Sequence, residues 1–133
     1  MKLLIAEDSR SDRVLLERIL TRAGHHVVAA ETSEKALDAF RAGEFDFALL
    51  DWMLPSVGGL TLIKEIREIE MSTRRYCIIV MVTAKARKED IVRALETGAD
   101  DFISKPIDEA LLLMKLKALA RLAEGKKIAK EGI

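Results

Sequence analysis

The sequence predicts an α/β fold with a parallel sheet, and three observations support this. Short apolar segments alternate five times with segments whose apolar residues recur at helical spacing. Parallel strands need helical crossovers between them, so this alternation favours one sheet with helices on both faces. The segments at 2–6, 47–50 and 77–82 are apolar almost throughout, as strands covered on both faces require. The length of 133 residues suits a single domain.

Most of the predicted elements have a start or stop signal of their own. Ser9 or Ser11 can cap the first helix, and Thr32 or Ser33 the second, because a hydroxyl oxygen there accepts a backbone hydrogen bond. Glycine commonly ends a helix, since it adopts the C-cap conformation without strain. The elements in order are strand 2–6, a helix ending at Gly24, strand 27–30, a helix ending at Gly43, strand 47–50, a helix through Leu62–Ile69, strand 77–82, a helix ending at Gly98, strand 101–103 and a helix from about Asp108 to Leu122.

Charge and cysteine content narrow the function classes. Lys plus Arg and Asp plus Glu both number 22, so the formal net charge is zero. Nucleic-acid and membrane-surface proteins usually carry a basic excess, so neither is expected as a partner, and no DNA-binding motif is present. Cys77 is the single cysteine, which favours a reducing compartment. No apolar run approaches about 18 residues and no signal-peptide pattern occurs, so we expect a soluble cytoplasmic domain.

Acidic side chains collect at the predicted carboxyl edge of the sheet. Glu7 and Asp8 follow the first strand, and Asp51 ends the third. The carboxyl ends of parallel strands share one edge, so these carboxylates meet if the two strands are neighbours. Crowded carboxylates raise one another's pKa unless a cation lies among them. Mg²⁺ prefers oxygen ligands, and the sequence therefore predicts a magnesium site.

Two more polar residues end the fourth and fifth strands, Thr83 and Lys105. A hydroxyl donor, an ammonium and a divalent ion around one carboxylate suit phosphoryl transfer, because the transferred group carries spread negative charge. An aspartate can itself be the nucleophile and form an aspartyl phosphate. Taken singly, each residue would read as a helix cap or a solvated side chain. Their joint position at the strand ends favours a phosphoryl-transfer site.

Four short motifs at these strand ends occur in a specific order: Ile5-Ala6-Glu7-Asp8, Leu50-Asp51-Trp52-Met53-Leu54-Pro55 with Gly58-Gly59, Val82-Thr83-Ala84, and Gly98-Ala99-Asp100-Asp101-Phe102-Ile103-Ser104-Lys105-Pro106. Together they resemble the receiver domain of two-component response regulators, the family of the chemotaxis protein CheY. The resemblance covers residues 2 to about 122, implies the strand order 2-1-3-4-5 and makes residues 1–122 the receiver domain. Residues 123–133 are then a basic tail or the start of a linker.

The resemblance implies a role for each acidic residue. Asp51 resembles the phosphoacceptor, which takes a phosphoryl group from the phosphohistidine of a histidine kinase. Asp8, Asp51 and the backbone carbonyl of Met53 resemble the Mg²⁺ ligands, with Glu7 helping directly or through water. The domain is then a regulatory phosphoacceptor that promotes its own phosphorylation and dephosphorylation, not a conventional enzyme.

The resemblance also implies how the signal leaves the site. Thr83 and Lys105 match residues that contact the phosphoryl oxygens, and Phe102 matches an aromatic switch that turns inward as Thr83 moves. The Lys105–Pro106 peptide bond is expected to be cis, which is uncommon enough to mark a geometric demand.

The implied partners are a sensor histidine kinase or phosphotransfer protein, and a downstream protein or attached effector. A phosphorylation-dependent homodimer is compatible with the family. The responding face consists of the helix ending at Gly98, strand 101–103 and the last helix. The residues expected on it are Lys88, Arg93, Glu96, Asp100 and Lys117.

Two side chains beside the site predict the lifetime of the phosphorylated form. Met53 lies two residues after Asp51, and Lys85 lies two residues after Thr83. A bulky apolar group and a long cation there hinder the water that would hydrolyse the acyl phosphate. We therefore predict slow self-dephosphorylation, which Met53→Asn should accelerate.

Other functions fit the sequence less well. A haloacid-dehalogenase-like, Mg²⁺-dependent phosphatase also uses an aspartate nucleophile, but it requires a second aspartate where Met53 stands. A flavodoxin-like cofactor binder needs a phosphate-cradling loop after the first strand, where Glu7 and Asp8 would repel phosphate without a metal. An interaction module with a dead site is disfavoured, because no expected acid, hydroxyl or lysine is missing.

Overall fold

Within residues 1–73, 75–84 and 87–131, which the computed structural model describes, the chain forms five strands and five helices. The strands are β1 (Lys2–Ala6), β2 (His26–Ala30), β3 (Phe47–Asp51), β4 (Ile78–Thr83) and β5 (Asp101–Ser104). The helices are α1 (Arg10–Arg22), α2 (Ser33–Ala42), α3 (Gly59–Met71), α4 (Lys88–Thr97) and α5 (Glu109–Glu131). All four strand pairs are parallel, in the order β2-β1-β3-β4-β5, which confirms the predicted fold.

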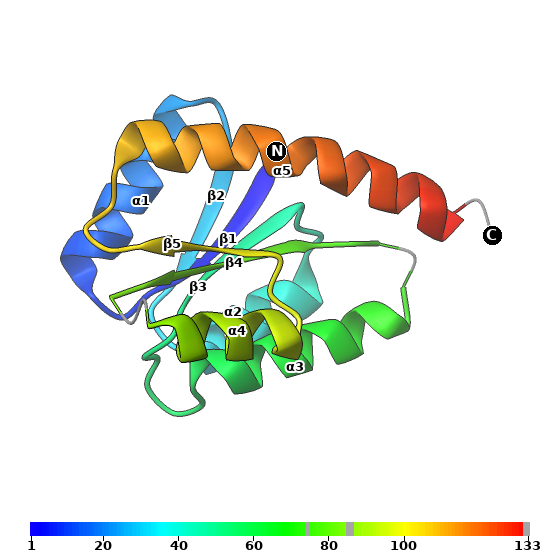
Figure 1. The fold of residues 1–133 in the computed structure, drawn as a ribbon, viewed down its shortest axis with the longest axis horizontal. Coiled ribbons are helices and arrows are strands. Elements are labelled where there is room, and N and C mark those ends of the chain that lie inside the picture. Colours follow the sequence, from blue (N-terminus) through cyan, green and yellow to red (C-terminus); the bar gives the residue numbers. More distant parts are fainter. Residues whose placement is uncertain (74, 85–86, 132–133) are drawn as a thin grey trace.

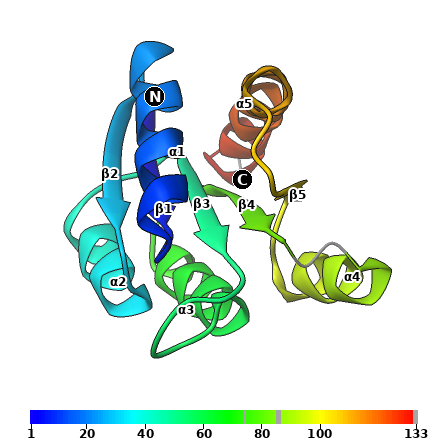
Figure 2. The same ribbon diagram turned by 90° about the vertical axis from the view of Figure 1, so that its left-hand side faces the viewer.

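The helices cover both faces of the sheet, as Figures 1 and 2 show: α1 and α5 lie on one face, and α2, α3 and α4 on the other. Each face has its own apolar core. Successive strand residues point to opposite faces, so Leu3 and Ile5 pack beneath α1 and α5 while Leu4 and Ala6 pack beneath α2 and α3. This double coverage explains why β1, β3 and β4 are apolar throughout rather than alternating.

Two serine and threonine caps resolve alternatives that the sequence left open. Ser9 caps α1, with its Oγ accepting from Asp12 N at 3.4 Å, and Thr32 caps α2 by accepting from Lys35 N at 3.1 Å. Ser33 is fully buried instead. Its Oγ donates to Pro55 O at 3.0 Å and accepts from Val57 N at 3.1 Å. Ser33 therefore fixes the loop between β3 and α3.

The last helix is longer than the sequence predicted. Its backbone stays helical to Glu131 rather than ending near Leu122, and Figure 1 shows this end of α5 projecting past the sheet. Gly125 does not stop it, because one glycine costs a helix only about 1 kcal/mol relative to alanine. None of the helices in the described part is both long enough and apolar enough to cross a membrane.

Candidate phosphoryl-transfer site

The carboxyl ends of the strands meet at one edge of the sheet, which faces the viewer in Figure 2. The strand register sets which ends are adjacent. Ala6 pairs with Leu50, so Glu7 follows directly beside Asp51. On the other side of β3, Asp51 pairs with Val82, and Thr83 pairs with Ser104. The polar residues that end four different strands are therefore brought to the same place.

Three of these residues form an acidic cluster. Carboxylate oxygens of Glu7, Asp8 and Asp51 all lie within 4.8 Å of one another. Glu7 is 1% exposed and Asp51 6%, whereas Asp8 is exposed to solvent. Glu7 Oε2 accepts from Ser9 N at 3.0 Å, but the buried Oε1 accepts no hydrogen bond of good geometry from the described residues. Three carboxylates that converge at one place, two of them buried, are the oxygen ligands that a hard divalent cation prefers.

Lys105 supplies the positive charge in this cluster. Its Nζ lies 2.7 Å from Glu7 Oε1, 3.0 Å from Asp12 Oδ2 and 3.2 Å from Asp51 Oδ2. The contact with Glu7 is a close ion pair without hydrogen-bond geometry, whereas Lys105 donates a hydrogen bond to Asp51. The Lys105–Pro106 peptide bond is cis, as expected.

The charges in the cluster shift the pKa of both kinds of group. Burial raises the pKa of Glu7 to about 7, and the neighbouring Asp51 carboxylate adds to the rise, although Lys105 opposes it. Burial alone would lower the pKa of Lys105, but its contacts with Glu7, Asp12 and Asp51 outweigh burial and raise it. Lys105 is therefore protonated at neutral pH, whereas a substantial fraction of Glu7 is protonated and uncharged near pH 7.

The loop after β3 holds Asp51 in position. Asp51 Oδ1 accepts from Met53 N at 3.2 Å, and Gly59 N donates to Trp52 O at 3.0 Å. The backbone at Gly59 approaches so closely that a Cβ there would lie 2.6 Å from Asp51 O. The Met53 side chain points outward and is 61% exposed.

Thr83 and Phe102 lie at the ends of the neighbouring strands. Thr83 is buried, and its carbonyl accepts from Lys105 N at 2.9 Å, which joins the ends of β4 and β5. Phe102 is partly buried against the core beneath α2, α3 and α4. Lys115 Nζ lies 4.8 Å from the centroid of its ring and donates to Phe102 O at 2.8 Å. The aromatic ring thus packs against the core on the α2, α3 and α4 side of the edge strand β5, with Lys115 of α5 beside it.

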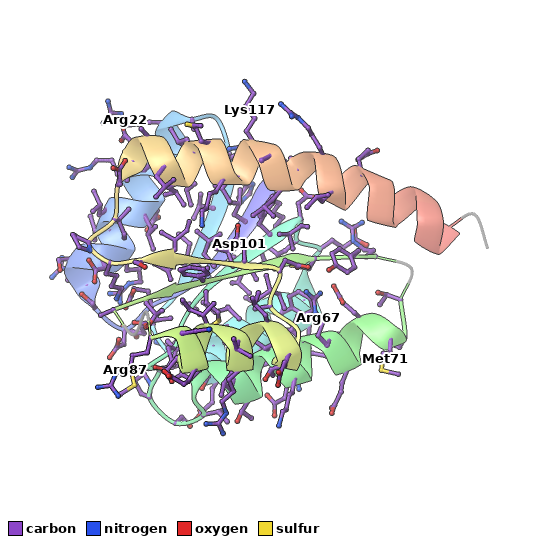
Figure 3. The ribbon with its side chains drawn as sticks, viewed as in Figure 1. Arg22, Arg67, Met71, Arg87, Asp101 and Lys117 are labelled. Carbon is purple, nitrogen blue, oxygen red and sulfur yellow. The ribbon has the colours of Figure 1, made fainter. Side chains whose placement is uncertain are left out.

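Four of the five residues expected on the responding face are exposed on α4 or α5: Lys88, Arg93, Glu96 and Lys117. Figure 3 shows Lys117 pointing away from α5. The expectation for Asp100 is wrong, because its side chain is only 10% exposed. It accepts hydrogen bonds from Arg67 at 2.8 Å, Tyr76 at 2.5 Å and Ile79 N at 2.9 Å. Asp100 therefore satisfies donors at the start of β4 instead of facing solvent.

Two residues of the site were missed by sequence reasoning, Asp12 and Arg13. Asp12 contacts Lys105, and Arg13 Nη1 donates to the carbonyls of Glu7 and Asp8 at 2.9 and 3.3 Å. Arg13 thereby ties α1 to the loop that carries the acidic cluster. Asp12 lies in the first turn of the helix that directly follows Glu7 and Asp8, and this short separation in sequence was the available signal.

Comparisons with known proteins agree with this geometry. The family model of the response regulator receiver domain matches residues 3–117. The phosphate regulon transcriptional regulatory protein PhoB of Escherichia coli is 38% identical over 90% of this chain and 52% of its own length. The sensory/regulatory protein RpfC of Xanthomonas campestris is 34% identical over 90% of this chain and 16% of its own length. The chain thus spans about half or less of the length of these relatives.

A solved structure shows the same architecture over nearly its whole length. The CheY-like receiver domain protein of Methanospirillum hungatei matches with a TM-score of 0.85 and 29% identity, covering 94% of this chain and 97% of that one. The family match, the strand order and the acidic edge of the sheet agree with one another. The chain belongs to the response regulator receiver domain family, whose members are regulatory phosphoacceptor domains of two-component signalling.

Proposed function

We propose that Asp51 is the phosphoacceptor of this domain and that Mg²⁺ and Lys105 assist the transfer. The observation that carries this proposal is the position of Asp51, a buried carboxylate shared between an acidic cluster and an ammonium group. Glu7, Asp8 and Asp51 would hold the ion, with the Met53 carbonyl as a further ligand. The donor is the phosphohistidine of a histidine kinase or of a phosphotransfer protein.

The transfer is a displacement at phosphorus. A carboxylate oxygen of Asp51 forms a bond to phosphorus while the bond from phosphorus to the donor's imidazole nitrogen breaks, and the electron pair returns to the imidazole. An ion held by Glu7, Asp8 and Asp51 would supply positive charge next to the phosphoryl oxygens, over which negative charge spreads. Lys105 and Thr83 donate hydrogen bonds to the same oxygens, Lys105 from the end of β5 and Thr83 from the end of β4. The domain thereby promotes its own phosphorylation. It also promotes the later hydrolysis of the acyl phosphate by water.

The response follows from what the new phosphoryl group attracts. The acyl phosphate carries up to two negative charges where the carboxylate carried one, and this favours a conformation in which Thr83 and Lys105 lie closer to Asp51. Movement of Thr83 opens space next to β5, which Phe102 fills by turning inward. The α4-β5-α5 face then changes its contacts with a downstream protein, an attached effector or a second copy of the chain.

Residues 1–122 constitute the receiver in this proposal, and residues 123–133 are a basic tail or the beginning of a linker. PhoB is named as a transcriptional regulator and RpfC as a sensory/regulatory protein, so the relatives join similar receivers to different functions. A cytoplasmic location is also implied, because Cys77 stays reduced there.

Intact mass and tryptophan fluorescence test the phosphoacceptor assignment together. Trp52 is the only tryptophan and is adjacent to Asp51, so its fluorescence should respond to Mg²⁺ and then to acetyl phosphate. The mass of the wild type should rise by one phosphoryl group, and that of Asp51→Asn should not. Asp38→Asn is the matched control, because Asp38 is exposed on α2. A wild type that takes up no phosphate with Mg²⁺ present would refute the proposal.

The exposed Met53 side chain supports the predicted slow loss of phosphate. It lies beside Asp51 at the solvent boundary, where a thioether neither donates to a water nor orients it. Met53→Asn supplies an amide there and should raise the dephosphorylation rate severalfold. Met71→Asn is the matched control, since Met71 is 84% exposed at the far end of α3. Equal lifetimes for both variants would contradict the prediction, whose other residue, Lys85, lies outside the described residues.

A further inference from the structure

Asp12 contacts the site from outside the acidic cluster. It lies in the first turn of α1, and its Oδ2 is 3.0 Å from Lys105 Nζ. The Asp12 side chain is 31% exposed, and its carboxylate is not part of the Glu7, Asp8 and Asp51 group. An ammonium has three N–H donors, and in this structure three carboxylates surround that of Lys105. All three carboxylates therefore attract the Lys105 ammonium before any phosphoryl group arrives.

We propose that Asp12 is a positioning residue that restrains phosphoryl uptake at Asp51, because it retains the Lys105 ammonium and adds a negative charge beside the incoming group. The inference rests on the proposed role of Asp51. It goes beyond that role, because it assigns to a residue of α1 control over how fast the site is phosphorylated.

Asp12 and an incoming phosphoryl group compete for the ammonium of Lys105. A divalent cation among Glu7, Asp8 and Asp51 would compensate the charge of those three carboxylates and weaken their attraction for Lys105. Asp12 lies outside that group and keeps its negative charge uncompensated. It is then the carboxylate that still competes with a phosphoryl oxygen for the ammonium hydrogens. Lys105 must loosen this contact before it can serve the phosphoryl group.

The site also keeps an excess of negative charge when a divalent cation is bound. With a divalent cation bound, the four carboxylates of Glu7, Asp8, Asp12 and Asp51 exceed the charges of that cation and Lys105 by one. The nearby Arg13 has a carboxylate of its own, because its Nη2 lies 4.0 Å from Glu31 Oε2. A phosphodonor that is itself an anion enters against this excess. Neutralising Asp12 removes the excess without touching a residue of the acidic cluster, so the barrier to an anionic donor should fall.

The test compares Asp12→Asn with Glu17→Gln at saturating Mg²⁺. Both variants remove one negative charge from α1. Glu17, however, is exposed and forms no ion pair within the described part of the chain. We expect Asp12→Asn to be phosphorylated by acetyl phosphate about three- to tenfold faster than the wild type, because one repelling charge near the anionic donor is removed. Glu17→Gln should remain at the wild-type rate.

Three further readouts separate this role from a merely structural one. The gain should be smaller with phosphoramidate, which carries less negative charge than acetyl phosphate, and it should shrink at high ionic strength. Asp12→Glu keeps the charge and should return the rate toward that of the wild type. A general loosening of α1 would alter the rates with both donors equally and would not depend on salt.

The outcomes are distinct. An Asp12→Asn rate equal to or below that of the wild type overturns the inference, as does an equal gain with both donors at every ionic strength. In either case the proposed function stands as long as the wild type takes up one phosphoryl group at Asp51. A wild type that takes up none overturns both.

Discussion

Lys105 Nζ donates a hydrogen bond to Asp51 Oδ2 at 3.2 Å, although 54 positions separate the two residues in the chain. Both stand where a strand ends, and only the parallel sheet brings them together. Asp51 is 6% exposed, so its charge has little water around it and depends on a cation for compensation. Without a metal ion, that cation is Lys105.

Lys105→Met should therefore destabilise the metal-free domain. Glu7 and Asp51 would remain buried without their counter-charge, and we expect the free energy of unfolding at about pH 8 to fall by roughly 1–3 kcal/mol. Urea unfolding followed by Trp52 fluorescence measures this. Lys88→Met, at an exposed position on α4, should change it by less than about 0.5 kcal/mol. Comparable losses in the two variants would show that the buried carboxylates do not need Lys105.

The raised pKa of Glu7 predicts how Mg²⁺ binding depends on pH. The pKa of Glu7 rises from 4.5 to about 7 in the folded protein. The protonated form therefore favours folding, and the stability that it contributes without metal is full below about pH 4.5 and is lost as the pH rises through about 7. Mg²⁺ must displace this proton, so its apparent affinity should rise with pH up to about 7 and then level off.

Fluorescence titration of Trp52 with Mg²⁺ across this pH range measures that affinity. Glu7→Gln cannot ionise, so its affinity should be weaker and should change less between about pH 5.5 and pH 8. A wild-type affinity that is constant over the same interval would contradict the shifted pKa of Glu7.

The close approach of Gly59 to Asp51 predicts unequal effects at two adjacent glycines. A Cβ at Gly59 would lie 2.6 Å from Asp51 O and 3.0 Å from both Met81 Cε and Trp52 Cα. Gly59→Ala should lower the free energy of unfolding by about 1–3 kcal/mol, because two of these neighbours are backbone atoms. At Gly58 the nearest atom is Trp52 O at 3.9 Å, and φ is −68°.

Gly58→Ala is therefore the matched control for the same loop. The added methyl meets ordinary contact distances and reduces the freedom of the unfolded chain, so stability should be unchanged or rise by up to about 1 kcal/mol. Thermal unfolding of the two variants measures this difference in stability. Equal melting temperatures would mean that the loop after β3 moves to accommodate the Cβ at Gly59 at little cost.

Arg67 joins α3 to the opposite end of β4 and to the turn before β5. Its guanidinium donates to Glu70 and Asp100 at 2.8 Å each, and to the carbonyls of Cys77 at 2.8 Å and Gly98 at 2.8 and 3.0 Å. Both carboxylates have little contact with water, with side chains 8% and 10% exposed. Arg67, labelled in Figure 3, is thus a cation that contacts both carboxylates.

Arg67→Met should thus be strongly destabilising, by about 3–5 kcal/mol, because it removes a hydrogen-bonded cation from two carboxylates that have little contact with water. Arg22→Met serves as the control. Arg22 is exposed in the last turn of α1, where a cation contributes at most about 1 kcal/mol through the helix dipole. Denaturant unfolding measures both variants, and a loss below about 1 kcal/mol at Arg67 would show that the carboxylates find other partners.

Local pattern was enough for much of the fold and for the centre of the site. Alternation of apolar segments predicted the elements, and the residues at the strand ends predicted the meeting of Glu7, Asp8, Asp51 and Lys105. Asp100 was misjudged because its motif position says nothing about the donors that it meets at β4. Ser33 was one of two candidate caps for the second helix. Its hydroxyl instead forms hydrogen bonds with the backbone of Pro55 and Val57 in the loop after β3.

The sequence by itself determined the strand-helix order and the chemical character of the sheet edge, since periodicity and strand ends are properties of neighbouring residues. Tertiary structure alone decided that Asp12 reaches Lys105 and that Arg67 contacts Asp100. Both contacts depend on side chains from distant segments meeting at hydrogen-bond distance. No local pattern encodes that distance, because it results from the packing of the whole sheet and its helices.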